Sequence, residues 1–596
     1  MANQSADAAF GVSRSASGQL WRLRDVNPRE ILHLTQRLGV SELLARLLVA
    51  RQISADAAQQ FLEPRLRDLL PDPSSLTDMD KAAARLADAV EAGEAVAVFG
   101  DYDVDGATSS AVLARYWKML GQNLRVHIPD RQKEGYGPNT AAFKQLQSDG
   151  YQLIITVDCG TMAHDVLQQA KADGLQVIVA DHHQTGGGLP PCYALINPRR
   201  PDDTSQLGHL AAVGVTFMLV VAVNRALRQR GFFDTRDEPQ LTQLLDLVSL
   251  GTVCDVVPLE GVNRAFVRQG SMVIDQGGNI GMAALARSAG ATPPFGTYEL
   301  GFQMGPRVNA GGRVGQADLG VRLLSCEDPE EAAGLAARLN DFNAERRNIE
   351  AQVLSEATAL AEEKIAQHNA PPPYLLLARK GWHPGVIGIV AGRLKDKYHR
   401  PSFIIALDDD GIGKGSARSV SSVDIGRLVA TAVDRQLIEA GGGHAMAAGV
   451  TLSENQIPAF EVFLTEQLGT MARDETRELK IEASLTAIAA SRALLEEVQQ
   501  VGPFGAGNPE PRFVVVNARI VKPSIVGDGH VRCILAGEGG GSLKAMAFAS
   551  VPEEVRQLIL TTREPLHIAG FLRADDWNGR RDVQFMVHDA AVARSA

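Results

Sequence analysis

Cysteine, long hydrophobic runs and excess positive charge are all scarce in this chain. Its five cysteines are scattered and show no CxxC spacing, which argues against a disulfide framework or a zinc ribbon and indicates a reducing cytoplasm. Residues 1–20 lack an apolar core behind a basic start, so we expect no secretory signal. The longest apolar stretch, Leu210–Val223, is shorter than the roughly 20 residues of a bilayer crossing, so we expect a buried helix and no membrane contact.

The net charge of −11 does not by itself suggest a nucleic-acid partner. Binding to phosphate depends on local patches and bound metal rather than on total charge, so such a partner is not excluded. One basic patch, between Arg379 and Arg400, holds six Lys or Arg residues against a single acid, Asp396. On charge alone, a solvated helix face is the favoured interpretation of this patch.

The 596 residues are enough for several domains, and their pattern predicts an α/β protein that ends in a β-barrel. From Lys81, short apolar runs alternate with amphipathic helices, which is typical of a parallel sheet. A long helical stretch from Asp328 to His368 stops before Pro371–Pro373, and a second α/β pattern follows. From Leu479 the pattern is mostly β, with short strands and Gly-rich turns that suggest an OB-fold.

These changes of pattern divide the chain into five parts. We expect an N-terminal helical segment at 1–75, a parallel-sheet α/β domain at 76–327, a connecting long helix at 328–370, a second α/β domain at 371–474 and an OB-fold-like barrel at 475–596.

Acidic residues follow three of the predicted strands in the first α/β domain. Asp101 follows the run Ala95–Phe99, with Asp103 and Asp105 close behind, and the other two strands run into Asp158 and into the sequence Asp181-His182-His183. Ligands bind beyond the carboxyl ends of parallel strands, so these side chains should share one edge of the sheet. We expect the alternate spacing to point Asp101, Asp103 and Asp105 one way if the segment stays extended.

So much negative charge in one place indicates divalent cations. Carboxylate and imidazole ligands suit Mn²⁺ or Mg²⁺, and Asp158 could bridge two such ions, as in two-metal hydrolases. For any one acid, a helix N-cap is an equally good interpretation, but three strand ends with a histidine pair favour a metal site. Asp255 follows an apolar helix and by itself is typical of a turn.

A series of short motifs resembles a known family. The segments, in chain order, are GDYDVDGATS, PDRQKEGYG, VDCG, DHH, GTVCDVVPL, GPRVNAGGR, GWHPGVIGIVAGRL, GSARS, GGGHAMAAG and PFGAGNPEP. They resemble the DHH phosphoesterase superfamily and, within it, the RecJ family of single-strand-specific 5′→3′ exonucleases. The resemblance runs from about residue 80 to the end, and it implies that 76–327 is a DHH catalytic domain and 371–474 its DHH-associated partner.

The resemblance assigns roles to individual residues. It implies that two Mn²⁺ or Mg²⁺ ions are bound by Asp101, Asp103, Asp105, Asp158, His182 and Asp255. Asp181 would orient a neighbouring histidine, and His183 would contact the scissile phosphate or assist the leaving oxygen. Arg307 would contact the phosphate near the metals, and Asn309 belongs to the same catalytic set. Cys159 departs from the family, where Asn is expected, and raises the question of thiol chemistry at this turn.

A second group of residues is expected to hold the nucleic acid. By resemblance, Arg131, Ser416 and Arg418 would bind the 5′-terminal phosphate, and the loops that carry them are Gly-rich, which lets a phosphate approach the backbone. Arg313, His383 and His444 are further candidates for contact with the strand, although turn-forming glycines with solvated arginines would give the same pattern. With the resemblance taken into account, the favoured interpretation of the basic patch at 379–400 is that it lines the path of the DNA.

The expected function is metal-assisted hydrolysis of single-stranded DNA from the 5′ end, with release of 5′-mononucleotides. The resemblance adds a single-stranded-DNA-binding protein and a helicase as partners in recombination and repair. One alternative is a DHH phosphoesterase for short oligonucleotides, cyclic dinucleotides or pyrophosphate, whose relatives generally lack a C-terminal barrel. The other is an inactive nucleic-acid-binding scaffold, which would have lost several of the acids that are present here.

Overall fold

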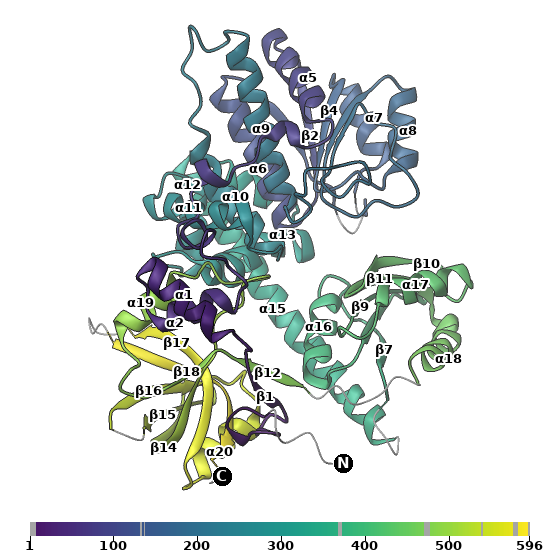
Figure 1. Cartoon of the computed structure of the whole chain (residues 1–596). Coiled ribbons are helices and arrows are strands. Elements are labelled where there is room, and N and C mark those ends of the chain that lie inside the picture. Colours follow the sequence, from purple (N-terminus) through teal and green to yellow (C-terminus); the bar gives the residue numbers. More distant parts are fainter. Residues whose placement is uncertain are drawn as a thin grey trace.

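The computed structural model describes residues 8–130, 134–135, 137–367, 372–469, 477–537, 540–575 and 582–593. In Figure 1 the first α/β domain lies at the top, the second at the lower right and the C-terminal barrel at the lower left. The long helix α15, Pro329–Ala366, runs between the first two. These parts agree with the predicted α/β architecture and its C-terminal barrel.

The N-terminal segment belongs to the barrel side of the molecule. It contains the helices α1 (Pro28–Leu38), α2 (Glu42–Val49), α3 (Ala58–Leu62) and α4 (Leu66–Leu69) and the short turns η1 (Ala9–Gly11) and η2 (Pro73–Ser75). The segment is mostly helical, as expected, but it also contains the strand β1 (Leu20–Leu23), which pairs in parallel with β12 (Glu478–Ile481). The segment packs on the barrel, because Leu44 and Leu47 share a hydrophobic cluster with Phe513 of the barrel.

The first α/β domain is built on a parallel five-stranded sheet of order β3-β2-β4-β5-β6. Its strands are β2 (Val96–Gly100), β3 (Leu124–His127), β4 (Leu153–Val157), β5 (Gln176–Ala180) and β6 (Ala194–Ile196). Every residue of β2 and β4 is buried, which agrees with their continuous apolar sequence and with helices on both faces. Strand β3 lies on one side of β2, and the later strands β4, β5 and β6 follow on its other side. The direction in which strands are added to the sheet therefore reverses between β2 and β4.

Helices cover this sheet, and further helices of the same domain lie below it in the view of Figure 1. They are α5 (Met79–Ala92), α6 (Val104–Met119), α7 (Thr140–Ser148), α8 (His164–Ala172), α9 (Ala212–Gln229), α10 (Leu245–Cys254), α11 (Gly261–Gln276), α12 (Ile280–Ala289), α13 (Gly305–Val314) and α14 (Leu319–Leu324), with the turns η3 (Leu241–Leu244) and η4 (Glu299–Met304). Among the described residues one helix, α9, is long and apolar enough to cross a membrane, but 72% of it is buried inside the fold. The buried helix expected at Leu210–Val223 is therefore confirmed.

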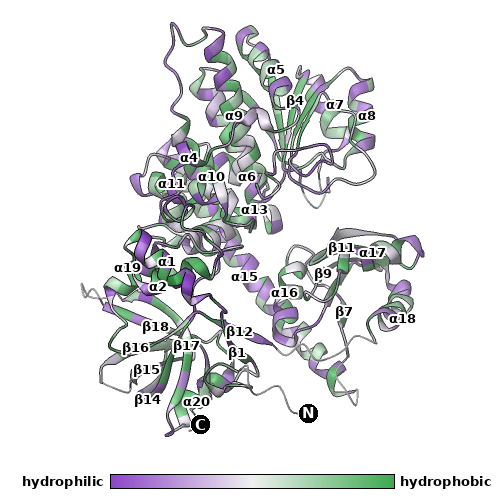
Figure 2. Cartoon of the chain, in the orientation of Figure 1, coloured by the Kyte–Doolittle hydropathy of each residue, from purple (hydrophilic) through white to green (hydrophobic). Residues whose placement is uncertain are grey.

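Helix α15 has two apolar faces that belong to different domains. Near its start, Leu335 and Leu339 lie in the core of the first domain, whereas Val353 and Ala357 lie in a cluster of the second. The ribbon between these contacts is largely hydrophilic in Figure 2. The helix begins at Asp328, whose side chain accepts a hydrogen bond from the backbone N–H of Glu331.

The second domain is a five-stranded sheet of order β10-β11-β9-β8-β7. Its elements are β7 (Leu375–Lys380), α16 (Ile387–Tyr398), β8 (Ser402–Leu407), β9 (Ile412–Arg418), α17 (Ile425–Asp434), β10 (Ala440–His444), β11 (Ala447–Ser453), η5 (Glu454–Gln456) and α18 (Ile457–Leu468). Only β7 and β8 are parallel, and the remaining pairs are antiparallel.

The C-terminal barrel closes because β14 pairs with both β15 and β17. Its elements are β13 (Ala483–Leu485), α19 (Arg492–Gln499), β14 (Phe513–Val526), β15 (His530–Ala536), β16 (Ser542–Ala547), α20 (Glu553–Thr561), β17 (Leu566–Asp575) and β18 (Asp582–Val592). Strands β14 to β18 therefore form a closed ring to which β13 adds on the outside of β14, and alternate residues such as Val531, Cys533 and Leu535 fill the interior.

One buried guanidinium joins the barrel side to the first domain. Arg264, on α11, donates hydrogen bonds to the carbonyl oxygens of Phe61 and Gly502 and lies 3.7 Å above the ring of Phe61. Burial lowers the pKa of Arg264 to about 9, with smaller contributions from Arg268 and Arg51. Arg264 therefore contacts two other segments, around Phe61 and around Gly502, that lie far from it in the sequence.

We predict that Arg264→Ala destabilises the chain by about 2 to 4 kcal/mol, since buried carbonyls lose a charged donor and an aromatic contact. Arg268→Ala is the matched control, because Arg268 lies one turn away on the same helix and donates to Leu62 but is exposed. Thermal and denaturant unfolding would measure both variants. Equal losses for Arg264→Ala and Arg268→Ala would contradict the role given to Arg264.

Candidate metal centre

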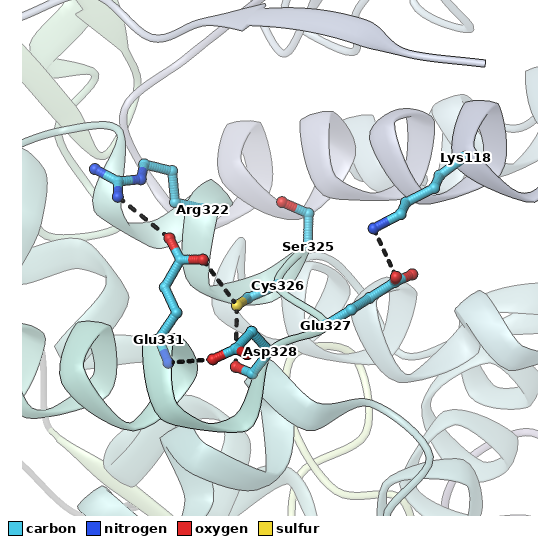
Figure 3. Close-up of a pocket in the computed structure, with 7 residues that line it drawn as sticks. All are labelled: Lys118, Arg322, Ser325, Cys326, Glu327, Asp328 and Glu331. Carbon is cyan, nitrogen blue, oxygen red and sulfur yellow. Dashed lines mark hydrogen bonds and ion pairs between the residues drawn. The ribbon is translucent and has the colours of Figure 1, made fainter. Parts of the chain in front are cut away.

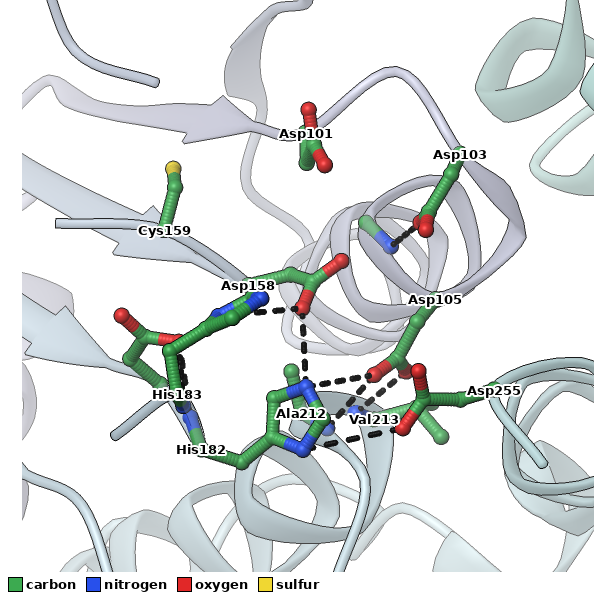
Figure 4. A network of polar contacts seen from close by, with 12 residues as sticks. Asp101, Asp103, Asp105, Asp158, Cys159, His182, His183, Ala212, Val213 and Asp255 are labelled. Atoms are coloured by element: carbon green, nitrogen blue, oxygen red, sulfur yellow. Dashed lines mark hydrogen bonds and ion pairs between the residues drawn. The ribbon is translucent and has the colours of Figure 1, made fainter. Parts of the chain in front are cut away.

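Three adjacent strands deliver carboxylates to one edge of the first sheet. Asp101 follows β2, Asp158 follows β4 and Asp181 follows β5, and all three side chains are buried. Their positions follow from the parallel order, because neighbouring strands end at the same level. Figure 4 shows Asp101, Asp158 and the histidine pair around one centre, with Asp103, Asp105 and Asp255 reaching it from the other side.

The segment from Asp101 to Asp105 does not stay extended, so the expected common direction of its three acids is wrong. Helix α6 begins at Val104, because Asp103 is its N-cap and accepts a hydrogen bond from the N–H of Gly106 at 3.0 Å. Asp105 therefore projects from the first turn of a helix. A Cβ on Gly106 would come within 2.4 Å of the carbonyl oxygen of Asp101, so this tight entry requires glycine.

Asp105 is held by the start of a second helix. Its two carboxylate oxygens accept hydrogen bonds from the N–H groups of Ala212 and Val213 at 2.7 and 2.8 Å. These are free donors of the first turn of α9, so the helix dipole also favours the negative charge. Nevertheless the pKa of Asp105 lies well above its ordinary value, chiefly through burial and then through the charges of Asp255 and Asp103.

His182 lies among three of the carboxylates. Its Nε2 is 3.3 Å from Asp158 and 3.8 Å from Asp105, and its Nδ1 is 3.6 Å from Asp255 and 3.2 Å from the carbonyl oxygen of Leu210. Burial lowers the pKa of His182 to about 4, and His183 adds to this effect. The ring is therefore neutral near pH 7, which is the form that binds a metal ion.

His183 is fixed by Asp181 rather than by the other acids. Its Nδ1 lies 2.7 Å from Asp181 Oδ1, and Asp181 also accepts hydrogen bonds from the N–H groups of His182, His183 and Thr161. Burial opposes the charge of both groups, but their hydrogen bond and mutual attraction outweigh it. The pKa of Asp181 is therefore far below its ordinary value and that of His183 is raised.

Ionisation of Asp158 and Asp255 is unfavourable in the protein alone. Burial, followed by the charges of Asp103, Asp105 and Asp101, raises the pKa of Asp158 well above its ordinary value. Burial and the charge of Asp103 raise the pKa of Asp255 to about 7. Asp255 Oδ2 is buried and has no hydrogen-bond partner among the described residues. A divalent cation would stabilise the ionised form of these carboxylates, so the residues fit such an ion.

The donor atoms form overlapping groups within which all atoms lie within 4.8 Å of one another. The groups are Asp101, Asp103 and Asp158; Asp105, His182 and Asp255; and Asp158, His182 and His183. The first group is all oxygen, and the second combines oxygen with imidazole nitrogen. Both combinations suit Mn²⁺ and Mg²⁺ better than a metal that prefers thiolate.

Helix α13 holds two of the ligand-bearing segments in place. The motif GPRVNAGGR is helical over residues 305–314, so the alternative interpretation of its glycines as turn formers is wrong. A Cβ on Gly312 would lie 2.7 Å from the carbonyl oxygen of Tyr102, and one on Gly305 would lie 2.3 Å from Sγ of Cys254. The glycines therefore let α13 pack directly on the residues next to Asp101 and Asp255. Asn309 lies on the same helix and is half-buried.

Comparison with known proteins assigns three parts of the chain to family models. Residues 95–252 match the DHH family, N-terminal domain, residues 372–470 the DHHA1 domain and residues 481–589 the RecJ OB domain. The single-stranded-DNA-specific exonuclease RecJ of Bacillus subtilis (strain 168) is 33% identical over 587 residues, which cover 97% of this chain and 71% of that protein. The chain belongs to the RecJ family.

Solved structures agree with this assignment. RecJ from Thermus thermophilus in complex with Mn²⁺ superposes with a TM-score of 0.80 at 28% identity, over 97% of this chain and 79% of that one. Its complex with Mg²⁺ gives a TM-score of 0.74 at 27% identity, over 96% and 79%. This RecJ-family chain is accordingly a metal-dependent exonuclease, which is a phosphodiester hydrolase.

The second domain of the RecJ-family chain turns polar residues towards the metal centre. Ser416 and Arg418 lie on strand β9 and not in a loop as expected, and Arg418 Nη1 donates to Ser416 Oγ at 3.0 Å. A Cβ on Gly388 would lie 3.0 Å from that hydroxyl, so the first turn of α16 faces the pair. Burial lowers the pKa of His444, and the charge of His183 lowers it further, which places the two histidines near each other.

The other predicted contacts have mixed outcomes. Arg313 Nη1 donates to the carbonyl oxygen of Gly385 at 3.1 Å and so joins α13 to the second domain. His383 accepts a hydrogen bond from the N–H of Gly385 and shapes the same turn. Arg307 donates to the carbonyl oxygen of Gln303, and its Nε lies 3.1 Å from Asn340. Arg131 lies outside the described residues.

Two residues near the histidine pair were missed. Asn197 Nδ2 donates to the hydroxyl of Thr161 and to the carbonyl oxygen of His183, both at 2.9 Å. Asn197 follows β6, the next parallel strand of the sheet, so the rule that located the acids could have found it. Arg199 was missed as well. Its positive charge lowers the pKa of Asp255 and of His182, so it lies close to the centre.

The thiol of Cys159 takes no part in the chemistry. Its side chain is buried, and burial, followed by the charges of Asp101 and Asp181, raises its pKa well above the ordinary value. Because only the thiolate reacts or binds metal readily, this cysteine is inert at neutral pH.

The basic patch at 379–400 is largely neutralised. Five of its six cations lie within 4.0 Å of a carboxylate, namely Arg379, Lys380, Arg393, Lys395 and Lys397. The prediction that the patch lines the DNA path as a positive surface is therefore weakened, because the acids come mostly from outside the patch and could not be seen in the local sequence.

A cavity of about 540 Å³ lies far from the metal centre. Figure 3 shows Lys118, Arg322 and several acids around it, with Cys326 between them. Lys118 and Asp105 occupy opposite ends of α6, which separates them by about 20 Å at 1.5 Å per residue. Charged side chains that line the cavity pair with one another, as Lys118 does with Glu327, so the cavity is not the site of hydrolysis.

We predict that metal binding and pH act on stability through Asp255. Its pKa is about 7 in the folded chain and about 3.9 in an unfolded one, so the folded state holds the proton more tightly. With a chelator present, its stabilising contribution is complete below about pH 4 and is lost as the pH rises to about 7. The Tm of the native chain should therefore fall across this range relative to that of Asp255→Asn.

Addition of Mn²⁺ at pH 7 should raise the Tm of the native chain and raise that of Asp255→Asn much less, because bound cation takes the place of the proton. Scanning calorimetry over pH 4 to 8, with and without chelator, measures both effects. Parallel pH profiles for the two proteins, or an equal response to Mn²⁺, would show that Asp255 does not face the metal.

Proposed function

We propose that this chain hydrolyses single-stranded DNA from its 5′ end and releases 5′-mononucleotides, with two divalent cations at the metal centre. The observation that carries the proposal is the pair of donor groups that meet at Asp158 and His182. Asp101 and Asp103 serve one side, and Asp105 with Asp255 serves the other. The single-strand preference stated in the name of the Bacillus subtilis relative supports the choice of substrate.

The two cations would be held by Asp101, Asp103, Asp158, Asp105, His182 and Asp255. When bound, they supply charge neutralisation at the phosphate and a water of lowered pKa. The protein contributes a rigid, buried set of donors, since β2, β4 and α9 each fix one carboxylate. Rigid placement matters because the donors then need no rearrangement during hydrolysis.

His183 is the residue best placed to give a proton to the leaving 3′-oxygen. Its Nδ1 is hydrogen-bonded to Asp181, which fixes the orientation of the ring beside the metal centre. The raised pKa of His183 favours the protonated ring, which is the form that a general acid requires. Arg307 would hold the neighbouring phosphate, and its neutral partners Gln303 and Asn340 leave its charge uncompensated.

Ser416 and Arg418 would bind the 5′-terminal phosphate and so set the direction of hydrolysis. Arg418 offers a charged donor, and the first turn of the 12-residue helix α16 faces the same place. A 5′ phosphate held there would leave the first phosphodiester bond towards the metal centre. The closed barrel supports a longer strand over a short oligonucleotide or pyrophosphate, because OB-folds bind single strands along their surface. Roles in recombination and repair, in the cytoplasm and with a single-strand-binding protein and a helicase, complete the proposal.

The metal assignment predicts the effect of Asp158→Asn. Hydrolysis of 5′-labelled single-stranded DNA in Mn²⁺ should fall by at least about 100-fold, because the variant weakens a donor that belongs to two of the three groups. Asp165→Asn, an exposed acid on the neighbouring helix α8, serves as the control and should hydrolyse normally. Activity of the native chain in chelator, equal degradation of duplex, or full activity of Asp158→Asn would each contradict the proposal.

The directional assignment predicts a substrate-specific defect in Arg418→Ala. For a 5′-phosphorylated strand KM should rise about 10- to 100-fold, because a charge-assisted hydrogen bond is lost, whereas a 5′-hydroxyl strand should show a much smaller change. Lys414→Ala is the control, since Lys414 is an exposed cation on the same strand. An equal rise for both strands would show that Arg418 does not read the 5′ phosphate.

A further inference from the structure

Two large aromatic side chains lie exposed side by side near the metal centre. Tyr298 is 58% exposed and Phe302 is 74% exposed, and their rings stack with centroids 5.5 Å apart and planes inclined by 25°. Aromatic rings normally contribute to cores, so a stacked pair in water is an unusual exposure of apolar surface. The pair therefore calls for a ligand that presents a flat apolar face.

The element that carries Phe302 packs against a proposed metal-binding segment. Phe302 lies on η4, a π-helix, and Tyr298 precedes that helix directly. A Cβ on Gly301 would lie 3.3 Å from Val253, and the thiol of Cys254 lies 3.6 Å from the carbonyl oxygen of Leu300. Asp255 is the next residue along the chain. One face of η4 thus touches the end of α10 while the aromatic pair faces solvent.

A phosphate-binding group is attached to the same turn. Arg307 donates its hydrogen bond to the carbonyl oxygen of Gln303, which adjoins Phe302 in the sequence. Burial lowers the pKa of Arg307 but leaves the guanidinium charged at neutral pH. An aromatic surface for bases beside a cation for phosphate is the combination by which proteins hold single strands without reading their sequence.

The other side of the pair faces the barrel. The hydroxyl of Thr297 donates to the carbonyl oxygen of Phe504 at 2.8 Å, so the residue before Tyr298 is tied to the segment that leads into the barrel. Arg573, on β17, is close enough for the negative charge of Glu299 to act on it. The pair therefore lies where the barrel meets the metal-binding domain.

We propose that Tyr298 and Phe302 form a stacking platform for bases of the DNA strand between the barrel and the metal centre, with Arg307 holding the adjoining phosphate. The inference rests on the proposed function, because it takes single-stranded DNA as the substrate. The platform would keep the strand in register as each 5′ nucleotide leaves. It also gives the strand a grip that does not depend on base identity, since every base has a flat face.

The test uses the full-length chain with oligonucleotides that carry 2-aminopurine at successive positions, in chelator so that the strand stays intact. Stacking on an aromatic ring should quench the fluorescence at one or two neighbouring positions. The double variant Tyr298→Ala, Phe302→Ala should lose this quenching and bind about 10- to 100-fold more weakly, as expected for one stacked base. The aromatic variant Tyr298→Phe, Phe302→Trp should retain both properties.

Two controls separate stacking from other causes. Val462→Ala and Ile488→Ala remove side chains that are 59% and 69% exposed elsewhere, and both should bind like the native chain. With abasic sites at the quenched positions, the native chain and the double alanine variant should bind equally. An unchanged affinity of the alanine variant for intact DNA, as for a surface that a protein partner covers, would overturn the inference. So would an equal loss on abasic DNA.

The outcome is distinguishable from a failure of the proposed function. If the native chain does not hydrolyse single-stranded DNA in Mn²⁺, the proposed function is wrong. If the native chain does so while the alanine variant binds normally, only the platform is wrong. Equal Tm values for the two proteins are required, so that a folding defect is not mistaken for lost stacking.

Discussion

Repulsion among buried carboxylates is the constraint around which the first domain is arranged. Asp158 and Asp255 are both buried near other acids, and burial together with the charges of those acids raises the pKa of each. The fold answers this locally by presenting backbone N–H groups of α9 to Asp105 and a neutral imidazole to the remaining oxygens. What it leaves uncompensated is matched by divalent cations, so the energetic cost of gathering these acids and the affinity for metal have one origin.

The same centre depends on contacts that cross domain boundaries. Helix α13 packs through Gly312 and Gly305 on the segments beside the acids, and its Arg313 reaches the second domain. Helix α15 fills part of one core with Leu339 and part of another with Val353, which fixes the spacing of the two domains. In the proposed function, a 5′ phosphate bound by Arg418 would therefore be connected to the acids through helices rather than through a flexible linker.

Local patterns predicted most of the fold and most of the site. Apolar runs located β2, β4 and β5 because buried parallel strands are apolar along their whole length, and strand ends located Asp101, Asp158 and Asp181. The helical start at Val104 was missed because Asp103 serves equally well as an N-cap or a ligand. Contacts between distant segments could not be predicted from local patterns. The sequence around β1 does not indicate its pairing with β12, and the acids that neutralise Lys397 and Arg379 lie on α15.

The parallel pairing of β1 with β12 has a consequence for synthesis of the chain. The two strands are separated by more than 450 residues, so the first emerges long before its partner exists. At roughly 5–20 residues per second, the delay is about 20 to 90 s. Throughout that interval Trp21 and its neighbours wait for the barrel that will bury them. Strand β1 can therefore reach its final place only after β12 has been synthesised.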